Sequence, residues 1–286
     1  MLIPKRAGEW KILFRPEKFG RYVNDHCILR GADGRLHMYG ITSHTDGDPR
    51  AERYFVHAAG DSMEQPMAEI GKSIDHGTLA WAPCVIKRDA DYYMFYGPSP
   101  TSLAVSPDMH EWFGYAVQIK DEPPMAVHRD HFVLEVAPGE YLMYVVGIRE
   151  HRSAVSLLSS HDLLHWQFEG YALTSGEHAE MNPAWGAMES PFVVKQGDLY
   201  YLFITYTNCS RETYNNTMVF VSHDPRCFGE YNGKNGALKP VAILDAHAPE
   251  IIFDNGKWYI TTCGWPKAAT PHPGCLSVAP LVWEET

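Results

Sequence analysis

A hairpin pattern recurs five times along the 286-residue chain, and this repetition restricts the fold more than any other feature. Each copy has a polar or aromatic opening pair, a short apolar run, a turn, and a second run rich in aromatic residues. The copies begin at Asn24, Trp81, Arg129, Glu189 and His247. The second residues of the opening pairs are 57, 48, 60 and 58 positions apart, so five units account for nearly the whole chain. A repeat of this length indicates one supersecondary unit used five times.

Each copy has the size and composition of one propeller blade. In the fifth copy, Asn255-Gly256 lies between two apolar runs, which is the strongest short-range signal for a hairpin. A unit of about 56 residues holds four short strands with their turns. No long stretch keeps a helical period of 3.6, which argues against helical solenoids, and a β-sandwich gives no reason for the self-similarity. We therefore predict an all-β fold, a single five-bladed β-propeller with four-stranded antiparallel blades, over residues 1–286.

A second motif recurs further into three of the units, as SPDMHEW, SSHDLLHW and SHDPRCFGEY from residues 106, 159 and 222. These segments could contact a sugar or could form turns. Ser and Asp side chains bond nearby backbone groups, and this chemistry explains every polar residue in the motif, so we favour turns. We expect the aromatic residues that follow, Trp112 and Trp166, to pack between blades.

The charge balance limits the partners. The chain carries 24 basic and 35 acidic residues and no basic cluster, which argues against nucleic acid or an anionic membrane as a partner. The first residues lack the apolar core of an export signal, and no run of 18 apolar residues is present, so we expect a cytoplasmic protein. The six cysteines show no CxxC spacing, and we expect buried thiols rather than disulfides.

The opening pairs carry the chemistry. If the innermost strand of each blade begins there, residues distant in sequence meet at one funnel. The second positions of the pairs are Asp25, Ala82, Asp130, Ser190 and Ala248. Two aspartates and a glutamate then share a pocket with an arginine, a histidine and a tryptophan. Glycoside hydrolysis needs such equipment, because one carboxyl protonates the leaving oxygen and another acts as base or nucleophile.

Three tripeptides carry a resemblance to known enzymes. NDH at residues 24–26, RDH at 129–131 and ESP at 189–191 resemble the NDP, RDP and EC or EGP motifs of five-bladed furanosidases. These enzymes are the fructofuranosidases of glycoside hydrolase families 32 and 68, and the arabinofuranosidases, arabinanases and xylosidases of family 43. The order Asp, Asp, Glu at matching repeat positions makes the signal stronger than any one tripeptide.

The resemblance implies a role for each residue. Asp25 would be the nucleophile, as in family 32, or the general base, as in family 43. Asp130 would orient sugar hydroxyls and tune the acid, and Glu189 would be the general acid. The expected substrate-binding residues are Asn24, Trp81, Arg129 and His247. His26 and His131 depart from the motifs, which have proline after each aspartate, and Ser190 stands where Cys or Gly is usual.

We expect no cofactor for the reaction and assign no metal ligand. The resemblance to family 43 admits a structural calcium ion in the funnel, beside His247. Glu250 lies two positions after Ala248, and we expect its side chain to point away from the face of Ala248 and to be structural.

The predicted function is hydrolysis of a furanoside, an arabinofuranoside or fructofuranoside, with a glycoside or oligosaccharide as partner. One alternative is a pyranosidase, for xylosides or galactosides, on the same fold. Another is a glycoside phosphorylase, which would need a cationic cluster for phosphate, with Arg129, Arg149, Arg152 and Arg211 as candidates. A third is a non-catalytic carbohydrate-binding propeller, against which the three carboxylates argue.

Overall fold

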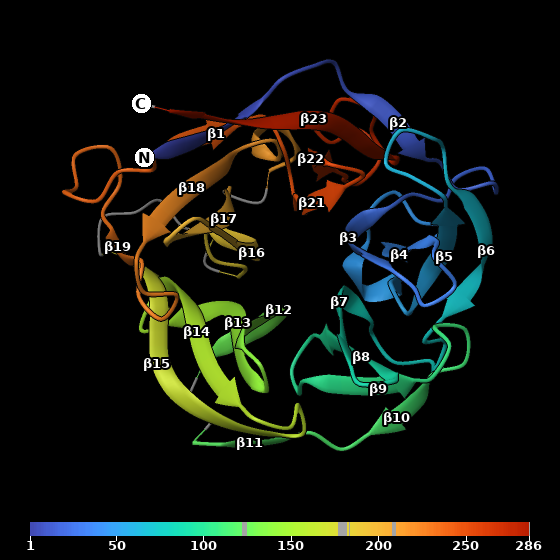
Figure 1. Ribbon diagram of the computed structural model, residues 1–286, viewed down its shortest axis with the longest axis horizontal. Helices are drawn as coiled ribbons and strands as arrows, with labels where there is room; N and C mark the ends of the chain where they lie inside the picture. The colour runs from blue at the N-terminus through green and yellow to red at the C-terminus, as the bar shows by residue number, and fades with distance from the viewer. Residues whose placement is uncertain (122–124, 177–181, 183, 208–209, 286) are drawn as a thin grey trace.

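Five β-sheets are arranged around one axis in the computed structural model (Figure 1). The structure describes residues 1–121, 125–176, 182, 184–207 and 210–285. Each hairpin predicted from the sequence forms the two innermost strands of one sheet, so the prediction of a five-bladed β-propeller is confirmed. Within the described part of the chain, no helix is long and apolar enough to cross a membrane.

The strands of each blade follow one another outward from the axis. Blade 1 contains β3 (Asn24–Arg30), β4 (Leu36–Thr42), β5 (Tyr54–Gly60) and β6 (Ala68–Ser73). Blade 2 contains β7 (Trp81–Arg88), β8 (Asp91–Gly97), β9 (Ser102–Ser106) and β10 (Phe113–Tyr115). Blade 3 contains β12 (Ala126–Ala137), β13 (Glu140–Arg149), β14 (Arg152–Ser160) and β15 (His165–Ser175).

The remaining strands form blades 4 and 5 and extend blade 3. Blade 4 contains β16 (Met188–Gln196), β17 (Leu199–Tyr206), β18 (Thr217–Ser222) and β20 (Ala242–Leu244). Blade 5 contains β21 (Ile251–Asp254), β22 (Lys257–Thr262), β23 (Leu276–Glu285), β1 (Leu2–Arg6) and β2 (Lys11–Phe14). Two short strands pair in parallel with β15, namely β11 (Gln118–Lys120) and β19 (Gly229–Tyr231). Two short 3-10 helices are η1 (Pro49–Ala51) and η2 (Arg211–Thr213).

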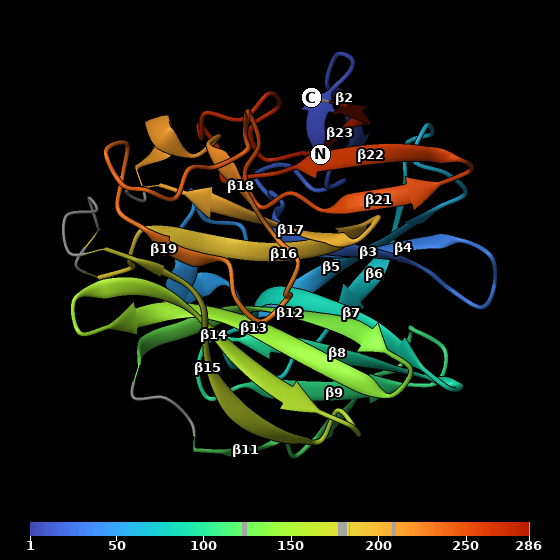
Figure 2. The same cartoon turned by 60° about the vertical axis from the view of Figure 1, so that its left-hand side comes forward.

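The ring is closed by strands from the two ends of the chain. β1 and β2 pair antiparallel with β23, with Leu2 opposite Glu285 and Lys11 opposite Val278. The two termini therefore lie side by side in both views (Figures 1 and 2). Blade 5 is therefore built from strands of both ends of the chain.

The two tryptophans of the recurring Ser/Asp motif pack between blades, as predicted. Trp166 is buried in a cluster with Phe95 of blade 2 and Met143 of blade 3. Trp112 lies edge-on to Tyr39, with ring centroids 5.5 Å apart, and so joins blades 1 and 2.

The motifs themselves form turns, which confirms the favoured interpretation. Ser160 Oγ accepts the backbone N–H groups of Asp162 and Leu163 at 3.2 and 3.0 Å. Asp162 Oδ1 accepts those of Leu164 and His165 at 2.9 and 2.8 Å. Ser106 and Asp108 repeat this pattern in blade 2.

A bulge opens the innermost strand of blades 1 to 4. The pairing of the first two strands shifts register after Asn24, Trp81, Arg129 and Glu189. The second residue of all five opening pairs has positive φ, at 33°, 45°, 58°, 51° and 46° for Asp25, Ala82, Asp130, Ser190 and Ala248. In a regular strand, neighbouring side chains point to opposite faces, and a bulge re-aims one of them. Both residues of a pair can therefore face the funnel.

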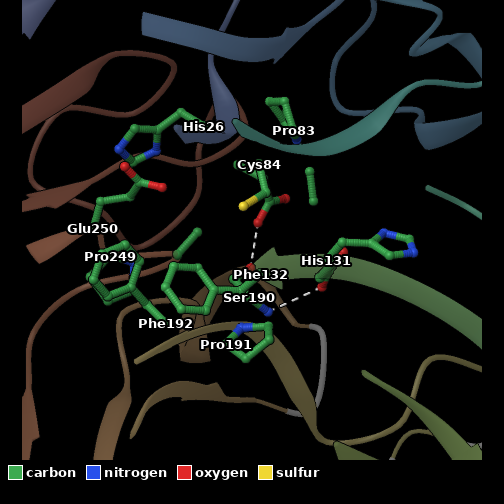
Figure 3. A pocket seen from close by; sticks show the side chains of 14 residues that line it. His26, Pro83, Cys84, His131, Phe132, Ser190, Pro191, Phe192, Pro249 and Glu250 are labelled. Atoms are coloured by element: carbon green, nitrogen blue, oxygen red, sulfur yellow. Dashed lines mark hydrogen bonds between the residues drawn. The ribbon is translucent and has the colours of Figure 1, made fainter. Parts of the chain in front are cut away.

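Below the bulges, the blades are joined around a narrow central shaft (Figure 3). Glu250 Oε2 of blade 5 accepts the N–H of Ile28 in blade 1 at 2.7 Å, and Cys84 Sγ of blade 2 accepts that of Val133 in blade 3 at 3.3 Å. Glu250 lines the shaft together with Ala248, so our prediction that it points away from this face was wrong. The positive φ of Ala248 breaks the alternation on which that prediction rested.

In blades 3 and 4, phenylalanines occupy the position that Glu250 holds in blade 5, two residues after the positive-φ residue. Phe132 and Phe192 meet with ring centroids 4.6 Å apart, so the shaft is apolar on this side. The cysteines that the structure describes are free, as predicted; Cys27, Cys84, Cys263 and Cys275 are buried, whereas Cys227 is exposed, so the prediction of a buried thiol was wrong there. Cys209 lies outside the described residues.

Candidate active site

A cavity of about 280 Å³ opens above the shaft, on the face where the innermost strands begin. Six of the seven residues predicted for the site line it: Asn24, Asp25, Trp81, Arg129, Asp130 and Glu189. They come from blades 1 to 4. The bulged strand starts thus bring together residues that lie up to 165 positions apart in sequence, as the pair Asp25 and Ser190 shows.

Hydrogen bonds join the three predicted catalytic carboxylates. Ser190 donates its hydroxyl to Asp25 Oδ1 and its backbone N–H to Asp130 Oδ2, the latter at 3.1 Å (Figure 3). Arg129 donates to Asp130 through Nη1 and to Glu189 Oε1 through Nη2, at 3.1 Å. Ser190, the departure from the usual Cys or Gly, is therefore the link between the two aspartates.

Burial changes the proton affinity of the aspartates. Burial raises the pKa of Asp25, against the opposing effects of His247 and the Ser190 hydroxyl, and Glu189 raises it further. Burial likewise raises the pKa of Asp130, although the Arg129 guanidinium acts in the opposite direction. A carboxylate whose pKa moves toward neutrality is a better base at neutral pH, because its proton affinity is higher.

His247 lies behind Glu189 instead of at the cavity surface. Its ring is fully buried and stacks on Tyr214 with ring centroids 3.7 Å apart. Nδ1 donates to the carbonyl oxygen of Cys263 at 2.9 Å, which leaves Nε2 facing Glu189 Oε2 at 3.5 Å. Burial lowers the pKa of His247, but Glu189 and Asp25 outweigh burial and raise it. His247, predicted to bind substrate, reaches the cavity only through Glu189.

The two histidines that replace motif prolines anchor the aspartates to the preceding blade. His26 Nε2 lies 2.8 Å from Thr261 Oγ1 in blade 5, and His131 Nε2 lies 2.8 Å from Thr101 Oγ1 in blade 2. Burial lowers the pKa of each to about 3, so both rings are neutral. Each histidine follows an aspartate with positive φ, and its bond fixes the strand just beyond the bulge.

Aromatic side chains form one wall of the cavity. Trp81 donates its Nε1–H to the carbonyl oxygen of Pro49 at 3.1 Å and meets Trp185 edge-on, with ring centroids 5.9 Å apart. Arg129 Nη2 also donates to the carbonyl oxygen of Trp185 at 3.1 Å. Indole faces beside a group of carboxylates suit a ligand with both apolar and hydroxyl surfaces, such as a sugar.

Among the other residues that line the cavity, Glu52, Tyr214 and Trp265 carry polar groups and were not predicted as site residues. All three lie in loops that follow the second strand of a blade, outside the hairpin repeat. A topological signal could have found them. The first strand starts at the cavity and the second returns to it, so the loop between the second and third strands lies on the same face.

The site does not fit a calcium ion. Ca²⁺ takes six to eight oxygen ligands. Among the described residues no group of three or more His, Cys, Asp or Glu side chains could hold a metal ion, and both ring nitrogens of His247 face protein groups. We therefore derive no step through a metal.

The described residues also provide no phosphate cluster. Arg149 lies over the ring of Tyr171, and Arg152 lies 3.8 Å from Glu230, so neither lines the cavity. Arg129 is held by Asp130 and Glu189. Arg129, Arg149 and Arg152 therefore give no support to a phosphorylase, and the side chain of Arg211 lies outside the described part of the structure.

A family model matches the part of the chain that forms blades 3 to 5. The model for "Glycosyl hydrolases family 43" matches residues 123–280, which is more than half of the chain and includes Asp130 and Glu189. The chain belongs to glycosyl hydrolase family 43. It is a glycoside hydrolase with a five-bladed β-propeller fold. Asp25 precedes the matched residues, so its role rests on the geometry and the NDH tripeptide.

Solved structures share the fold at low sequence identity. A GH43_1 enzyme from Xanthomonas citri, complexed with xylotriose, has 14% identity and a TM-score of 0.65, over 96% of this chain and 90% of that one. CoXyl43, a GH43 β-xylosidase/α-arabinofuranosidase from a compost microbial metagenome, has 17% identity and a TM-score of 0.60, over 98% and 96%. The GH32 β-fructofuranosidase BmSUC1 of Bombyx mori has 14% identity and a TM-score of 0.62, over 92% and 61%, so this chain spans less than two thirds of that enzyme. No curated protein sequence matches the chain.

Proposed function

We propose that this family 43 glycoside hydrolase cleaves the glycosidic bond of a furanoside, with Asp25 as general base and Glu189 as general acid. The observation that carries the proposal is the placement of both carboxyl groups on one cavity. There, they are joined through Ser190, Asp130 and Arg129.

The two carboxyl groups divide the proton transfers. Asp25 accepts a proton from a water molecule, whose oxygen attacks the anomeric carbon as the bond to the leaving oxygen breaks. Glu189 donates a proton to that oxygen, so the charges balance and the anomeric configuration inverts. Asn24 donates from Nδ2 to Asp25 Oδ2 at 3.2 Å, and Ser190 donates to Oδ1, which fixes the orientation of the base.

Asp130 and Arg129 hold the catalytic groups in position and balance their charges. Arg129 contacts both Asp130 and Glu189, so it offsets the repulsion between them. The contact with His247 gives Glu189 a partner with which it can share a proton between turnovers. Asn24 and Trp81 supply a polar and an apolar contact for the sugar.

The choice of a furanoside rests on resemblance. The NDH, RDH and ESP tripeptides resemble furanosidase motifs, and two of the similar structures are those of a β-xylosidase/α-arabinofuranosidase and a β-fructofuranosidase. A β-xyloside is the second candidate, because CoXyl43 is also a β-xylosidase and the X. citri structure holds xylotriose.

Initial rates on nitrophenyl glycosides of arabinofuranose, xylose and galactose, together with sucrose, test the substrate. We expect the highest kcat/KM on the arabinofuranoside. A preference for the xyloside would replace the furanoside with the pyranoside, and no turnover of any glycoside would contradict the proposal.

A further inference from the structure

A fourth carboxyl group, that of Glu52, lines the cavity that holds Asp25, Asp130 and Glu189. Glu52 ends the short helix η1 in the loop between β4 and β5, and it is 2% exposed. The backbone of this loop is held in place, because Ala80 donates its N–H to the carbonyl oxygen of Glu52 at 3.0 Å. The mechanism proposed above uses no part of this side chain.

The two carboxyl oxygens of Glu52 have different surroundings. Oε1 accepts the hydroxyl of Tyr22 at 2.7 Å and the indole N–H of Trp265 at 3.0 Å. Among the described residues, no donor lies within hydrogen-bond distance of Oε2. Oε2 is nevertheless absent from the set of polar atoms that are both inaccessible to solvent and without a partner, so it is accessible. This oxygen therefore lies at the surface of the cavity.

A buried carboxyl group with one oxygen that accepts no hydrogen bond lowers the free energy of unfolding, and this cost has no benefit unless the group has a function. Burial raises the pKa of Glu52 to about 7, although the bonds from Tyr22 and Trp265 act to lower it. Those two bonds fix the carboxyl plane and so fix the direction in which Oε2 faces the cavity. A ligand hydroxyl at this point would supply the missing hydrogen bond.

We propose that Glu52 is a specificity-determining residue, whose Oε2 accepts a hydrogen bond from a ring hydroxyl of a neutral sugar. This inference rests on the proposed glycosidase function. Four carboxyl groups line the cavity, and Arg129 is the cationic side chain among its described lining residues. Sugars that carry a carboxylate, phosphate or sulfate would meet like charge there, so the site selects uncharged sugars.

A set of monodeoxy glycosides compared in Glu52 variants at pH 8 tests the contact. In the wild type, removing the hydroxyl that faces Glu52 should lower kcat/KM by about 10- to 100-fold, the effect of a lost hydrogen bond to a charged group. Glu52→Ala should lose a similar factor on the parent glycoside and nothing further on that deoxy analogue. Glu52→Gln keeps an acceptor for Tyr22 and Trp265 and should also lose the preference for the parent glycoside over that deoxy analogue. It replaces Glu52→Ala in the test if that variant does not fold.

Glu250→Gln is the matched control, because Glu250 is also a buried carboxyl group but lies in the shaft below. This variant should keep the wild-type ratio between parent and deoxy glycosides. If Glu52→Ala lowers kcat/KM by the same factor on the parent glycoside and on every deoxy analogue, the two losses are independent. Glu52 then makes no contact with a sugar hydroxyl, and this inference fails while the proposed glycosidase function is unaffected. Calorimetric binding of the free sugars gives the same comparison without turnover; absence of both turnover and binding would contradict both proposals.

Discussion

The five innermost strands begin with the same backbone conformation but with different chemistry. In blades 1 and 3 the residue at positive φ is Asp25 or Asp130, whereas in blades 2 and 5 it is Ala82 or Ala248. A non-glycine residue in this conformation carries strain of roughly 1–2 kcal/mol. The alanines accept this strain without contributing a polar group to the cavity. The positive φ is therefore a property of the fold, and the side chain placed there decides whether the position offers a carboxylate to the cavity.

The largest expected effect comes from removing the carboxylate from one bulge. Asp25→Asn keeps the side-chain shape and an acceptor for Ser190, but the amide cannot take a proton from water. We expect kcat to fall by about 10³-fold or more on every substrate. Ala248→Gly, at the equivalent positive-φ position of blade 5, should retain activity. If Asp25→Asn kept even a tenth of the wild-type kcat, the base would have to be another residue.

A smaller and substrate-dependent loss is expected for the acid. Glu189→Gln should reduce turnover by about 10²–10⁴-fold on glycosides with poor leaving groups, because the departing oxygen then receives no proton. Activated aryl glycosides should lose much less, since their leaving groups need little protonation. Rates measured against leaving-group pKa distinguish this from a structural effect. Equal losses across the series would show that Glu189 is not the acid.

The free energy of unfolding should decrease at acidic pH because of the histidines that follow Asp25 and Asp130. His26 and His131 are neutral in the fold, with pKa lowered by burial to about 3, while an unfolded histidine has a pKa of about 6.5. Between these values the unfolded chain binds more protons, so the free energy of unfolding should fall as the pH drops from about 6.5 to about 3. Urea titrations across this range check the slope.

A matched pair of variants assigns this slope. His26→Gln should flatten the pH profile, because the proton uptake at this position disappears. His223→Gln, at an exposed histidine, should leave the profile unchanged. The same slope in His26→Gln as in the wild type would place the acid sensitivity elsewhere.

The smallest expected effect is on the free energy of unfolding, and it tests the positive-φ backbone at a position that carries no carboxylate, Ala248. Ala248→Gly should change the free energy of unfolding by less than about 1 kcal/mol, because relief of strain and loss of the buried methyl act in opposite directions. Ala248→Val should cost more than about 2 kcal/mol, since a β-branched residue is strongly disfavoured at positive φ. Equal stability of the two variants would argue against backbone strain at Ala248.

The repeat made the blades and six residues of the cavity predictable, because strand starts occupy equivalent places in a closed ring. The positive φ at these starts was not predictable from alternation, and for this reason Glu250 was assigned to the wrong face. Ring closure by β1 and β2 was also missed, because these strands lie outside the five copies.

The loops that complete the cavity carry no repeat. Glu52 acquires its role from contacts with Tyr22 and Trp265, which lie 30 and 213 positions away. His26 and His131 read as departures from a motif, and their bonds to hydroxyls of the preceding blade explain them only in three dimensions. Pairings between distant residues of different blades leave no local pattern in one sequence.

The stereochemistry of the product tests the role of Asp25 most directly. A proton NMR time course on the preferred glycoside records which anomer forms first, before mutarotation mixes the two. A general base leaves room for a water molecule between sugar and carboxylate, so the account predicts that the inverted anomer appears first. First appearance of the retained anomer, or a covalent sugar adduct trapped on Asp25, would contradict the account and make Asp25 a nucleophile.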